Sequence, residues 1–131
     1  MAKYAYPAIF TKEETGYSVA FPDIDGCATC GDSLPDAMEM AEDALSLMLY
    51  DREEEGAAIP VPSDVRSVQA GTDAVVSLVF CDTLEYRKYF DNRAIKKTLT
   101  IPNWLNTLSE RAGLNFSSVL QDALKARLGI Q

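Results

Sequence analysis

Histidine is absent from the 131-residue sequence, and only three residues are cysteine. Histidine is the most common general base near neutral pH and a frequent zinc ligand, so its absence removes most hydrolytic and metal-assisted mechanisms. Neither a Ser/His/Asp triad nor a Cys/His pair can be assembled. We therefore expect a protein that is not an enzyme and that carries no cofactor.

The three cysteines do not suggest a metal site either. Cys27 and Cys30 have the CxxC spacing, but a structural zinc needs four ligands and Cys81 is the only further thiolate. A thioredoxin-like pair would have its reactive thiolate at a helix start, whereas Gly31 and Asp32 follow Cys30 directly. We expect no metal site and reduced cysteines packed in strands.

Long apolar runs are also missing. No run approaches the roughly 20 residues that cross a bilayer, and residues 1–7 lack the charged-then-apolar order of a secretory signal. Apolar residues make up 47% of the chain, which is typical of a globular protein. We expect a cytoplasmic protein without a membrane partner.

Basic residues are scarce in the first part of the chain and acidic residues in the last. Residues 1–85 contain four basic and seventeen acidic side chains, a charge of −13, whereas residues 86–131 contain eight and three, a charge of +5. Solubility alone does not require such a separation. Opposite signs favour opposite partners: a basic protein for the acidic part and nucleic acid phosphate for the basic part.

The acidic part has the pattern of a small α+β domain. Two segments alternate with period two around a Gly-containing turn, and a later run is apolar and β-branched. Ser33 and Asp36 form a capping-box pattern before a helical apolar stripe. The predicted elements are strands at 3–10, 16–21, 27–30 and 73–81, a helix from Ser33 to Gly56, and an extended segment at 57–63. We expect a small antiparallel sheet with one helix packed on one face.

The basic part reads as one strand, residues 95–101, followed by two helices separated by a turn at Gly113. An isolated strand has no partner for its backbone hydrogen bonds. Two copies can pair their strands antiparallel above four helices, and the resulting ribbon fits the DNA major groove. This segment resembles the ribbon-helix-helix family of dimeric DNA-binding repressors.

Strand alternation divides the predicted ribbon into two faces. If Leu99 and Ile101 face the helices, Lys96, Thr98 and Thr100 face outward, where threonine suits base edges and lysine suits guanine or phosphate. We count Lys97 with the DNA-binding residues as well. The alternative is an ordinary edge strand with solvated Thr and Lys side chains.

The two predicted helices complete the module. Pro102 suits the first turn of the first helix, Gly113 suits its C-cap, and Asn115 suits the N-cap of the second. In ribbon-helix-helix proteins the start of the second helix anchors the DNA backbone, and Asn115, Ser117 and Ser118 match that place. The alternative is that these residues only cap the helix. The expected dimer core consists of Leu99, Ile101, Trp104, Leu108, Val119 and Leu120.

The front of the chain carries a second resemblance. The run from Tyr17 to Ser33, with its Phe-Pro-Asp, Gly-Cys and Gly-Asp elements, and the later segment 59–63 resemble the HicB antitoxin family. The resemblance implies a partial RNase-H-like domain at 1–85 that binds a HicA-like mRNA-cleaving toxin. It also implies a linker at 86–93 and a DNA-binding domain at 94–131 that represses the operon as a homodimer. Whether dimers pair into tetramers is left open.

An RNase H fold raises the question of catalysis through clustered carboxylates. Asp23, Asp25 and Asp32 lie close in sequence, but Gly26 comes too early for an EF-hand loop. We interpret them as turn and cap residues; a degenerate nuclease would show metal-dependent cleavage.

The leading hypothesis is thus a toxin-binding autorepressor. The alternative is a free-standing ribbon-helix-helix regulator with a ligand-sensing front domain. A neighbouring reading frame for a short basic protein with a histidine would favour the first.

Overall fold

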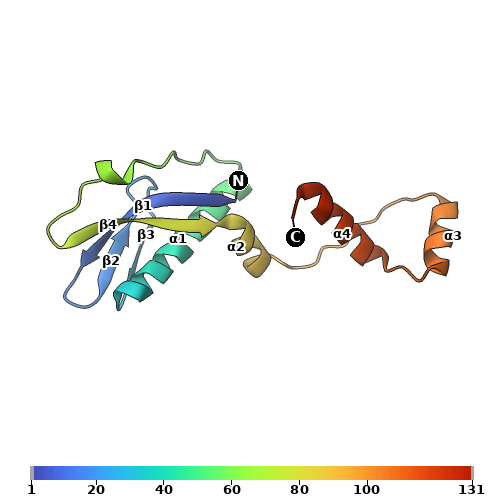
Figure 1. Ribbon diagram of the computed structural model, residues 1–131, viewed down its shortest axis with the longest axis horizontal. Helices are drawn as coiled ribbons and strands as arrows, with labels where there is room; N and C mark the ends of the chain where they lie inside the picture. The colour runs from blue at the N-terminus through green and yellow to red at the C-terminus, as the bar shows by residue number, and fades with distance from the viewer. Residues whose placement is uncertain (1, 131) are drawn as a thin grey trace. The chain divides into compact units, whose positions relative to one another are not determined.

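The computed structural model describes residues 2–130. Four strands between Lys3 and Asp82 form an antiparallel sheet (Figure 1). Its strands are ordered β3-β2-β1-β4. All four fall on segments predicted to be strands, so the predicted sheet is confirmed. The strands are β1 (Lys3–Lys12), β2 (Tyr17–Ala20), β3 (Ala28–Gly31) and β4 (Ala74–Asp82).

One face of the sheet carries the hydrophobic core. In the central strand β1, Tyr6, Ala8 and Phe10 alternate onto this face and are buried. Helix α1 (Leu34–Glu55) packs against the same face. The apolar stripe predicted for this helix is its buried side, and Ala37, Ala41, Leu45 and Leu49 are all 0% exposed.

The ends of α1 follow from local hydrogen bonding. Ser33 is the N-cap, and its Oγ accepts a hydrogen bond of 3.3 Å from the Asp36 N–H. At the other end, Gly56 adopts the left-handed conformation with φ 67°, and its N–H bonds to carbonyls of the last turn. Both predicted helix ends are confirmed.

The connection between α1 and β4 is extended apart from one 3-10 turn, Val65–Ser67. It is held against the loop after β2 by Asp23, whose carboxylate accepts hydrogen bonds from the Ser63 N–H at 2.9 Å and from the Ser63 Oγ at 2.5 Å. Asp23 lies in a turn, as expected, and its side chain joins this turn to the connection before β4.

Helix α2 (Thr83–Phe90) was not expected. Asp82 is its N-cap and accepts hydrogen bonds from the N–H groups of Leu84 and Glu85. The expected linker at 86–93 differs accordingly, because its first five residues complete this helix, and the helix packs on α1. The chain divides into two compact units only after Arg93.

The second unit contains helices α3 (Asn103–Arg111) and α4 (Phe116–Leu128), so two helices are found where two were predicted. Gly113 has φ 70° at the turn, and Asn115 caps α4 by accepting a 3.0 Å hydrogen bond from the Ser118 N–H. Helix α3 begins one residue later than expected. Pro102 is its N-cap, with ψ 144°, and not a residue of its first turn.

The strand predicted at 95–101 is not formed in the single chain, where residues 92–102 have no regular secondary structure. The physical reason is the one that motivated the dimer expectation: a ribbon strand needs hydrogen-bond partners, and within the described residues none pairs with this segment.

Candidate nucleic-acid interface and partner-binding surface

The second unit has no core of its own. None of the residues from Ala94 to Ile130 is buried in the single chain. Large apolar side chains are instead open to solvent, with exposed fractions of 65% for Trp104, 57% for Leu108 and 48% for Val119. Leu99 and Ile101 are exposed as well, and Leu120 is half-buried. These are the six residues predicted to form a dimer core.

The residues predicted to read DNA lie in the second unit, in the segment before α3 and at the start of α4. Lys96, Lys97, Thr98 and Thr100 are all exposed, and within residues 2–130 no ion pair engages either lysine. At the start of α4, Ser117 and Ser118 are exposed too. The Asn115 amide oxygen already satisfies the Ser118 N–H, so Asn115 acts as a cap in the single chain.

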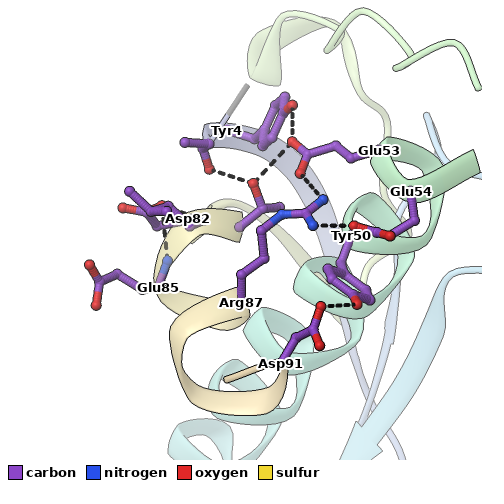
Figure 2. A network of polar contacts seen from close by, with 11 residues as sticks. Tyr4, Tyr50, Glu53, Glu54, Asp82, Glu85, Arg87 and Asp91 are labelled. Carbon is purple, nitrogen blue, oxygen red and sulfur yellow. Dashed lines mark hydrogen bonds and ion pairs between the residues drawn. The ribbon is translucent and has the colours of Figure 1, made fainter. Parts of the chain in front are cut away.

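In the first unit the densest polar network joins α1, α2 and β1 (Figure 2). Glu53 of α1 is its centre: one carboxylate oxygen accepts hydrogen bonds from Tyr4 Oη at 2.6 Å and Thr83 Oγ1 at 3.0 Å. Its other oxygen accepts one from Arg87 Nη2 at 3.0 Å. Arg87 also pairs with Glu54, and its guanidinium lies 4.7 Å from the centre of the Tyr50 ring.

The network shifts the titration of its members. Burial acts to raise the pKa of Glu53, but the hydrogen bonds from Tyr4, Arg87 and Thr83 outweigh it, so the pKa is lowered. Burial and the bond to Glu53 together raise the pKa of Tyr4 to about 12. These directions are typical of a structural anchor, because hydrogen bonds from three side chains stabilise the ionised carboxylate and lower its basicity.

Sequence reasoning missed this network. The available signals were Asp82 followed by Thr83, an N-cap pattern, and the aromatic pair Tyr86 and Phe90 at i,i+4 spacing. They were outweighed by the polar and basic character of the segment, which was interpreted as a linker.

Within the described residues no group of three or more histidine, cysteine or acidic side chains is placed to hold a metal ion. Cys27 and Cys81 are buried and Cys30 is exposed, and all three are free. Burial raises the pKa of the Cys81 thiol to about 11, so it is not a reactive thiolate. Of the helices in residues 2–130, none is long and apolar enough to cross a membrane.

Comparison with known proteins decides the family. A family model described as the HicB-like antitoxin of bacterial toxin–antitoxin systems matches residues 6–121, which cover most of both units. The chain belongs to the HicB-like antitoxin family. This assignment confirms the resemblance seen in the sequence, and with it the expectation that the chain is not an enzyme.

Individual relatives agree with the family. Antitoxin HicB 2 of Photorhabdus laumondii is 43% identical over 58 residues, covering 44% of this chain and 42% of that protein, so the match spans less than half of the curated antitoxin. An uncharacterised 14.9 kDa protein of Haemophilus phage HP1 is 32% identical over 101 residues, covering 74% of this chain and 72% of the phage protein.

Two solved structures share the fold. A toxin–antitoxin complex from Streptococcus pneumoniae includes a chain that is 31% identical, with a TM-score of 0.63 and coverage of 95% of this chain and 99% of that one. The antitoxin HicB of Burkholderia pseudomallei is 21% identical, with a TM-score of 0.55 and coverage of 94% and 98%. This second likeness concerns the fold alone.

Proposed function

We propose that this HicB-like antitoxin neutralises a HicA-like mRNA interferase through residues 1–93 and represses its own operon through residues 94–131. In this proposal two copies pair the 95–101 segments into a ribbon that binds operator DNA. An mRNA-cleaving toxin and operator DNA are both partners found in the bacterial cytoplasm, where we place the protein.

The observation that carries the DNA-binding half is the missing core of the second unit. Eleven large apolar residues between Ile95 and Leu128 are more than a third exposed in the single chain. Soluble monomers rarely expose apolar surface at this density, and such surfaces mark association sites. A second copy offers the same apolar residues and the same unpaired strand, so a symmetric dimer satisfies both needs at once.

The proposed dimer also orients the candidate DNA readers. If Leu99 and Ile101 are buried between the copies, alternation turns Thr98 and Thr100 outward with Lys96. The start of α4 then supplies backbone N–H groups and the Ser117 hydroxyl for phosphate. The excess of basic over acidic residues after residue 93 is consistent with this role.

The toxin-binding half is supported by the family and by charge. The structural relative from Streptococcus pneumoniae is part of a toxin–antitoxin complex. Residues 1–93 contain seven basic and eighteen acidic side chains, a charge of −11, which favours a basic protein partner.

Co-expression with the product of the neighbouring reading frame tests the proposal directly. We expect a stable complex, loss of the RNA cleavage shown by the partner alone, and retardation of DNA from the operon's own promoter. A wild-type chain that neither co-purifies with the neighbour nor retards this DNA would refute both halves.

A further inference from the structure

A pocket lies in the first unit where α1, the end of β4 and α2 meet. Its volume is about 550 Å³. Its walls come from Glu39 to Ser46 on α1, from Phe80 and Asp82 at the end of β4, and from Glu85 to Phe90 on α2. A smaller hollow of about 180 Å³ shares Met40, Asp43, Tyr86 and Phe90 with it and continues along α1. The two form one groove, which we call the α1–α2 groove.

The charged side chains that line the α1–α2 groove are all acidic: Glu39, Glu42, Asp43, Asp82 and Glu85. Two already have a local role, since Asp82 caps α2 and Glu85 pairs with Lys88 at 3.1 Å. The three carboxylates on α1 have no ion pair anywhere in residues 2–130. The groove thus carries negative charge that nothing in the described chain neutralises.

Aromatic rings form the other part of the lining. Phe80 is 54% exposed, Phe90 60% and Tyr89 78%, although residues of this size are usually covered. The centre of the Phe90 ring lies 4.6 Å from that of Tyr86 and 4.7 Å from that of Tyr89. The rings of Tyr86, Tyr89 and Phe90 therefore form a cluster that lines the groove.

Aromatic faces beside unpaired carboxylates are a binding environment for a guanidinium group. Arginine stacks its planar head on aromatic rings and donates two parallel hydrogen bonds to a carboxylate, which lysine cannot do. The hollow at Met40 and Leu47 is lined mainly by apolar residues, which suits the apolar neighbours of such an arginine.

We propose that the α1–α2 groove is a docking site for an arginine-bearing basic segment of the partner toxin. This inference rests on the proposed toxin-binding function and adds the surface and the recognition chemistry to it. The charge complementarity selects this occupant, because a neutral or acidic segment would leave the three carboxylates of α1 unpaired beneath it.

Two triple variants of the full-length chain separate the groove from general electrostatics. The groove variant is Glu39→Gln, Glu42→Gln, Asp43→Asn; the control is Glu14→Gln, Asp25→Asn, Glu55→Gln. All six residues are exposed, and both variants remove three negative charges. With the neighbouring gene product as ligand, we expect the groove variant to lose about tenfold or more in affinity and the control less than about threefold.

Equal affinities of the two variants would overturn the groove assignment and leave toxin binding intact. A groove variant with a changed oligomeric state in light scattering, with no change in toxin affinity, would show that a second copy occupies the groove, which also overturns it. Failure of the wild type to bind the neighbouring product would refute the proposed function instead.

A small probe tests the groove without any toxin. Titration of the ¹⁵N-labelled full chain with N-acetyl-argininamide should shift amide resonances of α1 and α2 around the groove. The isosteric but uncharged N-acetyl-citrullinamide should not, and the groove variant should lose the response. Absent shifts, or equal shifts with both probes, would contradict the inference.

Discussion

Two glycines meet where β2 begins and β3 ends, and each is required by its surroundings. Gly16 has φ +79°, and a Cβ placed there would lie 2.3 Å from the Gly31 carbonyl oxygen. Gly31 pairs with Tyr17, and a Cβ on it would lie 2.3 Å from the Ala37 nitrogen. The hairpin, the third strand and the start of α1 are thus joined at a point that admits no side chain.

Gly16→Ala should destabilise the first unit by about 2–4 kcal/mol, because it combines a left-handed backbone with a steric clash. Gly71→Ala is the matched control: nothing lies within 4 Å of its Cβ position and its φ is not in the left-handed range, so we expect a change within about 0.5 kcal/mol. Urea unfolding followed by circular dichroism measures both. Equal midpoints for the two variants would contradict this account of the hairpin.

The ribbon residues have separable roles. Thr98→Ala and Thr100→Ala should each cost about 1–3 kcal/mol on the cognate operator and little on scrambled DNA, because base edges carry the sequence information. Lys96→Ala should weaken binding to both DNAs and flatten the salt dependence, because phosphate contacts release counterions. Since a dimer loses two contacts per substitution, the losses can be about twice the single-contact figure.

Titrations on both DNAs at two salt concentrations distinguish these outcomes. Threonine variants that bind both DNAs like the wild type would show that Thr98 and Thr100 are not the readers.

At the scale of elements, Glu53 is the residue that joins α2 to both α1 and β1. Glu53 accepts hydrogen bonds from Tyr4 on β1 and from Thr83 and Arg87 on α2. It therefore connects α1, β1 and α2, which are distant in sequence. Removal of a buried acceptor that several donors share lowers the free energy of unfolding, because those donors stay buried without a hydrogen-bond partner.

Glu53→Gln should lower stability at neutral pH and remove a pH dependence. The pKa of Glu53 in the folded state lies below its usual 4.5, so its contribution is complete above pH 4.5 and is lost as the pH falls through the lower, folded-state value. The wild type should therefore lose its advantage over the variant below pH 4.5. Urea midpoints at neutral and acidic pH measure this. A constant difference across this range would show that Glu53 does not titrate as described.

The elements that were predictable are those whose signal is local. Alternation in β1 and β2 and the Ser33 cap of α1 encode their own structure, because the side chains involved are neighbours on one segment. Helix α2 was missed because its eight residues are too few to form a helix alone and are held by Glu53 and Tyr50 on α1.

The candidate site was predictable only in part, for the same reason. The left-handed turn at Gly113 and the Asn115 cap were predicted correctly because they are local, although the C-cap of α3 is Ala112, one position before Gly113. The strand at 95–101 does not form in the single chain because its proposed partner is a second copy. The α1–α2 groove was beyond sequence reasoning, since it needs the position of α2 to bring Phe90 near Glu39 and Asp43.

At the scale of the whole molecule, the division after Arg93 coincides with a change in charge. The first unit carries −11; residues 94–131 contain five basic and two acidic side chains, a charge of +3. A chain truncated after Arg93 retains the core, α2 and the hydrogen bond of 3.1 Å from Tyr50 to Asp91.

The truncated chain 1–93 should therefore fold, bind the toxin with an affinity close to that of the full chain, and lose DNA binding. Circular dichroism, toxin titration and operator retardation measure the three properties. Operator affinity in the truncated chain would contradict the division of labour, and loss of toxin binding in a folded truncated chain would place the toxin site elsewhere.

Assembly is the last property to test, and Leu99→Asp addresses it. In a symmetric ribbon this substitution places two carboxylates face to face in the dimer core, where burial of unpaired charge opposes association. The variant should lose operator binding, because one strand makes no ribbon. Light scattering should give it the same oligomeric state as the truncated chain 1–93. Both proteins lack the contact between residues 94–131 of two copies, whereas any association through the first unit persists. Thr98→Asp adds the same carboxylate to the opposite face of the strand, where alternation turns residue 98 outward, and should keep the wild-type oligomeric state although it weakens DNA binding. A Leu99→Asp chain that keeps the wild-type oligomeric state and retards operator DNA at wild-type concentrations would refute the ribbon, because no register of the strand tolerates both observations.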